Sequence, residues 1–202
     1  MFRKISMLVI CSSVLLSVAV AQEYRSDAAI SFTGVLNQGS SGNGLLQDPT
    51  NSGGLLASYR LAFGNHSGVE FNYGYSRSTQ NYTAGFLGAT AGQPANVHEV
   101  TAAYVFSLNH SGRLNPFVLG GGGALVFSPV GSFFNPIVGA DTQAKGTFLY
   151  GAGVDYRLMR GLGLRLQYRG LVYKAPDFGL SAVSTDSWTH TAEPSVGLVL
   201  RF

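Results

Sequence analysis

The last stretch of the chain, His190–Phe202, is HTAEPSVGLVLRF. Every second residue from Val196 is apolar, and these residues are Val196, Leu198, Leu200 and Phe202. The interleaved set is mostly polar or small and comprises Glu193, Ser195, Gly197, Val199 and Arg201. This period of two predicts a β-strand with two different faces, because successive side chains of a strand point to opposite sides. We expect such a closing strand in a membrane barrel, where the last strand pairs with the first and leaves no edge.

Charged residues are scarce in this chain. Its 202 residues suit one domain, with 46% hydrophobic, 12% aromatic and only 11% charged residues. A soluble domain has about 25% charged residues. Beyond the N-terminus no stretch approaches the ~18 consecutive apolar residues of a membrane-spanning helix. A transmembrane barrel meets the same need with apolar residues at alternate positions.

The N-terminus has the pattern of a secretory signal peptide. Arg3 and Lys4 precede the apolar run Ile5–Val20, and Ala19–Ala21 is a small-residue cleavage site. We therefore predict that residues 1–21 are a signal peptide cleaved after Ala21 and that residues 22–202 form the barrel domain. Cys11, the only cysteine, would leave with the signal, so we expect no disulfide. Losing two basic residues reduces the formal charge of +3 to +1, which gives no indication of nucleic-acid binding.

Alternation recurs along the rest of the chain. It predicts strands at Ala28–Leu36, Gly54–Phe63, Gly68–Arg77, Val97–Leu108, Leu114–Phe127, Thr147–Leu158, Leu162–Tyr173 and the closing stretch. Long connections at Asn37–Gly53, Ser78–Asn96, Ser128–Lys145 and Lys174–Ser187 alternate with short turns at Gly64–Ser67, Asn109–Gly112 and Met159–Gly161. A soluble β-sandwich gives no reason for this alternation. We therefore predict an all-β fold, an eight-stranded antiparallel up-and-down transmembrane β-barrel with short periplasmic turns and long extracellular loops.

Aromatic residues mark one face of most predicted strands. We expect the following to point outward, with those near strand ends at the membrane interfaces: Tyr59, Phe63, Phe71, Tyr73, Tyr75, Tyr104, Phe106, Tyr150, Tyr156, Tyr168 and Phe202. In Leu114–Phe127 the residues that share a phase are Phe117, Leu119, Leu125 and Phe127.

Several segments resemble a known family. FLYGAGVDYRL at Phe148–Leu158 and GLGLRLQYR at Gly161–Arg169 resemble the sixth and seventh strands of OmpA/OmpX-like outer-membrane β-barrel proteins. PFVLGGG at Pro116–Gly122 resembles that family's PY-x-x-G-G-G strand, and VGLVLRF resembles its C-terminal assembly signal. The resemblance implies a monomeric barrel in the bacterial outer membrane, without a peptidoglycan-binding domain. Its expected partners are outer-membrane lipid, lipopolysaccharide and the barrel assembly machinery, which would recognise Val196, Leu198, Leu200 and Phe202.

Charged residues fall on the face opposite the aromatics. We expect them to form a charge network in the lumen, and they are Arg60, Glu70, Glu99, Asp155, Arg157, Arg165, Arg169, Glu193 and Arg201. Side chains fill the interior of an eight-stranded barrel, so buried charges there must pair. We interpret the network as a structural plug. The alternative is a gate that opens a small pore when its ion pairs break.

Other motifs give weaker indications. Gly120–Gly123 lacks the Gly-Lys-Ser/Thr ending of a phosphate loop and fits a barrel strand better. No two of His66, His98, His110 and His190 have the i, i+2 or i, i+4 spacing of a metal site. His190 and Ser195 are five residues apart and so lie on opposite faces of a strand. We therefore expect no catalytic residue, metal or cofactor.

The long loops remain as the place for function. They are rich in Gly, Ser, Asn and Thr and contain Phe86, Phe133, Phe134 and Phe178. Loops on a rigid scaffold commonly carry binding sites, although they can equally be variable surface. We expect a structural or adhesin-like role through an extracellular ligand. A narrow passive solute pore is the alternative, and an outer-membrane lipid-modifying enzyme is a weaker one, because relatives include all these classes.

Overall fold

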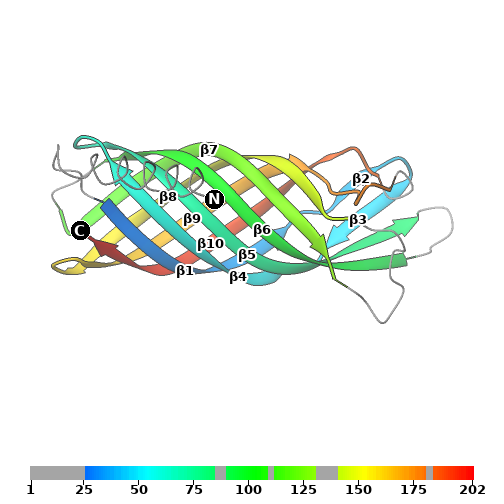
Figure 1. Ribbon diagram of the computed structural model, residues 1–202, viewed down its shortest axis with the longest axis horizontal. Helices are drawn as coiled ribbons and strands as arrows, with labels where there is room; N and C mark the ends of the chain where they lie inside the picture. Colours follow the sequence, from blue (N-terminus) through cyan, green and yellow to red (C-terminus); the bar gives the residue numbers. More distant parts are fainter. Residues whose placement is uncertain (1–25, 85–89, 109–111, 131–140, 181–183) are drawn as a thin grey trace, which may run out of the picture.

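Eight strands close into an antiparallel barrel in the computed structural model, which describes residues 26–84, 90–108, 112–130, 141–180 and 184–202 (Figure 1). They are β1 (Ser26–Asn37), β4 (Ser52–Ala62), β5 (Ser67–Ala84), β6 (Thr90–Ser107), β7 (Leu114–Pro129), β8 (Gln143–Met159), β9 (Leu162–Lys174) and β10 (Trp188–Arg201). Each pairs with the next, and β10 returns to β1, with Ala28 opposite Leu200. The predicted eight-stranded up-and-down barrel is confirmed. The described residues include no helix that is long and apolar enough to span a membrane.

The first long connection contains a hairpin that the sequence analysis missed. The prediction of a loop over Asn37–Gly53 is wrong in part, because β2 (Ser40–Gly42) and β3 (Leu45–Pro49) lie within it and β3 pairs with the far end of β5. Asn43 and Gly44 have φ angles of 50° and 75° at the turn. An Asn-Gly pair favours such a tight hairpin turn, since both residues tolerate a positive φ.

The second long connection is mostly strand. The prediction of a loop over Ser78–Asn96 is wrong for most of this range. β5 and β6 continue past the barrel and stay paired up to Thr83 opposite Thr90. Residues 85–89 of this predicted loop, 131–140 of the third and 181–183 of the fourth lie outside the described residues, as do residues 1–25 and 109–111. The sequence predictions for the signal peptide and for four loop or turn residues therefore lie outside the described part of the chain. These residues are Phe86, His110, Phe133 and Phe134.

The outer surface of the barrel is apolar. All eleven aromatic side chains predicted to point outward are exposed, from Phe106 and Tyr156 at 39% to Phe202 at 70%. Ile30 and Phe32 add aliphatic and aromatic area on β1, at 69% and 73% exposure. Such a band of exposed apolar side chains is stable in lipid and would aggregate in water.

The interior is divided between polar and apolar walls. An apolar cluster includes Phe117, Leu119, Leu125 and Phe127 of β7, Val105 of β6, Leu149 of β8 and Leu171 and Tyr173 of β9. Buried polar residues such as Ser31, Ser58 and Asn72 line β1, β4 and β5. The four in-phase residues of β7 thus face the lumen, unlike the in-phase aromatics of the other strands.

The glycine run lies inside β7. A Cβ at Gly121 would lie 2.0 Å from the Ala102 carbonyl oxygen, and one at Gly123 would lie 2.1 Å from that of Val100. Glycine is therefore required for the close approach of β7 to β6. The location of Gly120–Gly123 within a strand rules out a phosphate-binding loop.

Candidate functional site

The lumen contains two layers of ion pairs. Eight of the nine residues predicted for the charge network take part in them, and Arg157 lies apart. They come from β4, β5, β6, β8, β9 and β10, where alternation places their side chains on the inner face.

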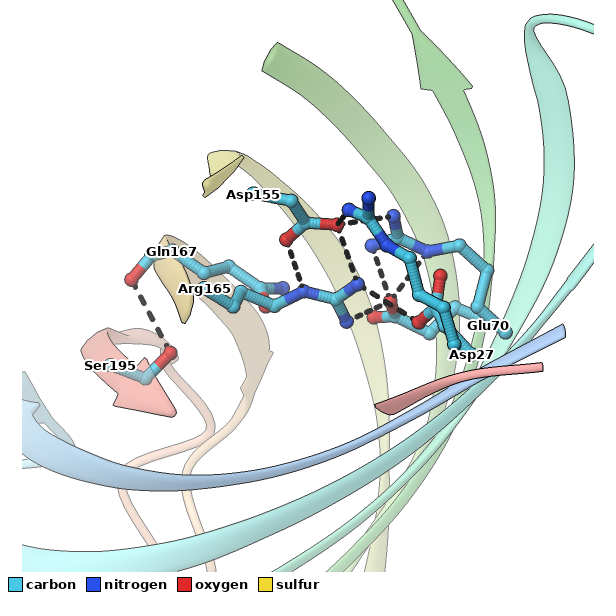
Figure 2. A network of polar contacts seen from close by, with 8 residues as sticks. Asp27, Glu70, Asp155, Arg165, Gln167 and Ser195 are labelled. Carbon is cyan, nitrogen blue, oxygen red and sulfur yellow. Dashed lines mark hydrogen bonds and ion pairs between the residues drawn. The ribbon is translucent and has the colours of Figure 1, made fainter. Parts of the chain in front are cut away.

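The first layer, here called the Arg165 layer, comprises Asp27, Arg60, Glu70, Asp155, Arg165 and Arg201 (Figure 2). Arg165 is fully buried and donates hydrogen bonds to Asp155 at 2.7 and 3.0 Å, to Glu70 at 3.0 Å and to Asp27 at 3.0 Å. Arg60 lies 2.6 Å from Glu70 and 3.5 Å from Asp155. Arg201 reaches Asp155 at 3.2 Å.

This layer balances its own charge. Three carboxylates meet three guanidinium groups, so no residue of the layer is buried without a counter-ion. The ring of Phe117 supports two of the cations, with its centroid 4.3 Å from the Arg60 guanidinium and 5.3 Å from that of Arg165. A desolvated cation over an aromatic face gains about 2 kcal/mol. The layer is therefore a charge-balanced partition across the lumen.

The second layer, here called the Arg169 layer, comprises Glu99, Thr101, Arg169 and Glu193. Arg169 donates a hydrogen bond to Glu99 and lies 3.3 Å from Glu193, to which it is also paired across strands. Thr101 donates to Glu99 at 2.7 Å. The Nε and Nη1 atoms of Arg169 have no hydrogen-bond partner among the described residues. The Arg169 layer is therefore less completely bonded than the Arg165 layer.

Arg157 lines a cavity at the end of the barrel where β1 begins and β10 ends. This cavity, here called the terminal vestibule, has a volume of about 520 Å³. Its lining includes Asp27, Arg60, His66, Asn115, Arg157, Arg160 and Arg201. The vestibule thus extends from this end of the barrel to the Arg165 layer.

The opposite end of the lumen is capped by the connection between β9 and β10. Phe178 is fully buried in the apolar cluster with Tyr82 and Phe127, and Tyr82 donates a hydrogen bond to the Pro176 carbonyl at 2.7 Å. Nearby, Ser187 donates to the Ser41 carbonyl at 2.6 Å. This loop-end cap joins the β9–β10 connection to the β2–β3 hairpin and to β5.

Asp177 fixes the cap to β8. Its carboxylate accepts hydrogen bonds from Gln143 and from the Gly179 amide at 3.1 Å, and lies 3.6 Å from Lys145. Partial burial alone would raise the pKa of Asp177. The hydrogen bonds and the lysine outweigh it, so the pKa of this carboxyl lies below its usual value.

The histidines of the strands lie on the outer face. His98 is 2.9 Å from the Tyr73 hydroxyl and His190 is 3.0 Å from that of Tyr150. Ser195 points the other way, into the barrel, where it donates to the Gln167 carbonyl at 3.4 Å. The described residues hold no group of three His, Cys, Asp or Glu side chains that could bind a metal.

Sequence reasoning missed two parts of the lumen. Asp27 lies just before the predicted first strand, yet it shares the parity of the inward residues Ala29 and Ser31. That parity was the available signal. Phe178 gave no such signal, because its burial depends on the packing of a connection over the barrel mouth.

The residues of the predicted assembly signal lie on the lipid-facing surface. Val196, Leu198, Leu200 and Phe202 are exposed by 44%, 54%, 57% and 70%. The backbones of Phe202 and Ser26 exchange two hydrogen bonds of 3.0 Å. The signal is therefore part of the β1–β10 strand pair that closes the barrel.

Comparisons with known proteins agree with this architecture. A family model described as outer membrane protein beta-barrel domain matches residues 7–202. No curated protein sequence matches the chain. Among solved structures, OprG from Pseudomonas aeruginosa has a TM-score of 0.65 at 13% identity, covering 89% of this chain and 96% of its own.

Two further solved structures share the fold. Neisserial surface protein A has a TM-score of 0.56 at 11% identity, with coverage of 90% of this chain and 98% of its own. Ail, the attachment invasion locus protein of Yersinia pestis, has a TM-score of 0.53 at 19% identity, with coverage of 90% and 100%.

Proposed function

The chain belongs to the outer membrane protein beta-barrel domain family, which implies the bacterial outer membrane, and we propose that it acts in surface interaction through its long connections. The observation that carries this proposal is the closed lumen. Two ion-pair layers and the loop-end cap occupy the interior, while the described parts of the connections at the capped end form hydrogen-bonded structure. A barrel of this kind is a rigid support for its loops.

The capped end offers a preformed surface. The β2–β3 hairpin and the ends of β5 and β6 extend the sheet beyond the barrel wall. Leu46 on this hairpin and Trp188 at the start of β10 are 55% and 65% exposed. Exposed aromatic and aliphatic groups among polar residues favour recognition of another surface.

The charge of this end argues against a polyanionic ligand. Ail was solved in complex with the heparin analogue sucrose octasulfate. In this chain, by contrast, Lys145 pairs with Asp177 and Lys174 lies 2.8 Å from Asp186. We therefore propose a ligand bound through polar and aromatic contacts, such as a neutral glycan or a protein surface.

A binding screen with matched truncations tests the proposal. One variant replaces the β2–β3 hairpin with a short turn, and another shortens β5 and β6 at their paired ends. Cells with each variant are applied to arrays of glycans and purified matrix proteins, with equal surface levels checked by heat-modifiable gel mobility. We expect one truncation to remove a binding signal of the intact protein. Binding that is absent, or unchanged by every truncation, would contradict the proposal.

A narrow pore is the second candidate, because the terminal vestibule already opens the lumen as far as the Arg165 layer. A gate would then open the incompletely bonded Arg169 layer. Planar-bilayer recordings of the intact protein and of Arg169→Ala would test this. Stepwise channels in either protein would favour the pore, and their absence in both would eliminate the gate.

The remaining proposals concern partners and chemistry. We propose a monomeric, non-enzymatic barrel without a cofactor, surrounded by outer-membrane lipid and lipopolysaccharide. We also propose that the barrel assembly machinery recognises Val196, Leu198, Leu200 and Phe202. The exposure of these four apolar side chains on the outer face of β10 supports that recognition.

A further inference from the structure

The terminal vestibule has the size of a ligand site. Its volume of about 520 Å³ falls within the roughly 300–1,000 Å³ typical of small-molecule pockets. It lies at the opposite end of the barrel from the proposed interaction surface, and the Arg165 layer forms its floor. A ligand would therefore enter from the end where β1 begins and β10 ends, which in this architecture faces the periplasm.

The vestibule has an excess of positive charge. The Arg165 layer uses Arg60 and Arg201 to balance its own carboxylates. Arg157 and Arg160 also line the cavity, and their side chains form no ion pair with any residue in the described part of the chain. Two guanidinium groups thus exceed the side-chain charges that are matched internally, and the terminal carboxylate of Phe202, which also borders the cavity, offsets at most one of them.

The same end of the molecule is basic as a whole. The described residues there include six arginines (Arg60, Arg113, Arg157, Arg160, Arg165 and Arg201) and three acidic side chains (Asp27, Glu70 and Asp155). Beyond the Arg169 layer the described charges are Arg77, Lys145 and Lys174 against Asp48, Asp141, Asp177 and Asp186. The uneven distribution attracts anions to the vestibule and not to the capped end.

Polar groups complete the lining. Asn115 is only 6% exposed, and its Oδ1 atom has no hydrogen-bond partner among the described residues. His66 borders the cavity with its ring stacked on Phe106 at a centroid distance of 5.9 Å. Ser67 next to it is fixed by a 2.6 Å contact with the Tyr104 hydroxyl. An ordered wall of this kind holds a ligand at a lower cost in conformational entropy.

We propose that the terminal vestibule binds a small oxyanion, a solute with phosphate or carboxylate groups, through Arg157 and Arg160. A guanidinium group presents paired N–H donors that match two oxygens of such a group. The side-chain amide N–H groups of Asn115 and a ring N–H of His66 supply further donors at the wall, whereas the unpartnered Oδ1 of Asn115 is an acceptor and does not bond to the anion. This site lies at the opposite end of the barrel from the proposed interaction surface. An experiment that contradicts one proposal therefore leaves the other intact.

Calorimetric titration of the mature barrel in nanodiscs tests the site, with inorganic pyrophosphate and citrate as probes. We expect saturable binding of at least one probe with one site per barrel. Hydrogen bonds to charged groups are worth about 1.5–3 kcal/mol, so Arg157→Gln and Arg160→Gln should each weaken binding by about tenfold or more. Arg157→Lys should retain part of the affinity, because it keeps the charge and loses the paired geometry.

Arg113→Gln is the matched control. It removes the same charge from the same end of the barrel, but Arg113 does not line the vestibule. We expect an affinity within about twofold of the intact protein, since exposed charges are screened by salt. Heat-modifiable mobility establishes that each variant is folded. A loss with Arg113→Gln as large as with Arg157→Gln, or no saturable binding of either probe to the intact protein, would overturn the proposal.

Discussion

Replacing Arg165 with methionine removes the centre of the Arg165 layer and keeps most of the side-chain volume. Arg165 is fully buried and contributes four hydrogen bonds of 2.7–3.0 Å to Asp155, Glu70 and Asp27. Its loss leaves three carboxylates facing two guanidinium groups, and two of those carboxylates, Glu70 and Asp155, are fully buried. We expect Arg165→Met to lower the free energy of unfolding more than any other single arginine substitution in this layer.

The magnitude follows from what remains. Removing one partner of a buried ion pair costs about 3–5 kcal/mol, because the other charge stays buried. Arg60 still lies 2.6 Å from Glu70, and Arg201 still lies 3.2 Å from Asp155. These contacts offset part of the excess negative charge, so we expect a loss near the lower limit, about 3 kcal/mol. Arg201→Met should cost less, about 1 kcal/mol, because Arg201 is partly exposed and forms one bond.

The assay is urea unfolding of the barrel in lipid vesicles, with the folded fraction measured from heat-modifiable gel mobility. Arg113→Met is the control, since Arg113 is exposed at the same end of the barrel. The double variant Arg165→Met, Glu70→Gln should recover part of the loss, because it restores the charge balance. If Arg165→Met changed the unfolding free energy by no more than Arg113→Met, within about 0.5 kcal/mol, the layer would not stabilise the barrel as argued.

Three other predictions follow from the strands and the cap. Gly121→Ala should lower the free energy of unfolding by about 1–3 kcal/mol, because the new Cβ would lie 2.0 Å from a β6 carbonyl oxygen. Gly120→Ala is the control, because a Cβ there meets no atom within 4 Å, and equal unfolding midpoints of the two variants would contradict the prediction. Deleting Phe202 should lower the amount of barrel in the outer membrane, while Met159→Ala, also exposed, should not; a normal level of the deletion variant would remove the basis for the assembly role. The pKa of Asp177 is lowered in the folded protein, so its contribution to the cap is complete above the unfolded value of about 3.9 and is lost as the pH falls through the lower folded value. The protection factors of cap amides, which correct for the intrinsic pH dependence of exchange, should therefore fall below about pH 4 in the native protein and show no such step in Asp177→Asn.

Much of the barrel could be predicted from local pattern. Alternation identified the eight strands and the faces of their aromatic residues, because a strand alone determines which side chains share a side. Alternation did not show whether the in-phase apolar residues of β7 face the lipid or the lumen. Phe117 and Phe127 of this set are buried in the lumen. The placement of Phe117 depends on Gly153 of β8, where a Cβ would lie 2.5 Å from the Phe117 ring.

The connections were predicted less well. Asn43-Gly44 is a hairpin signal that composition obscured, because Gly, Asn and Ser are also frequent in irregular loops. The extension of β5 and β6 shows no clear alternation, because its buried side includes the polar residues Ser78, Gln80 and Gln93. Periodicity is informative only where one side of a strand meets a different environment.

The sequence by itself determined that this chain forms a lipid-facing barrel with its charges on the inner set. Low charge and a period of two require only that one face meets lipid and the other does not. Only the tertiary structure decided which charges meet. Arg165 and Glu70 are 95 positions apart, on β9 and β5, and their 3.0 Å contact crosses the lumen. The strand tilt, register and diameter of the closed barrel set that distance, and no stretch of sequence contains those quantities.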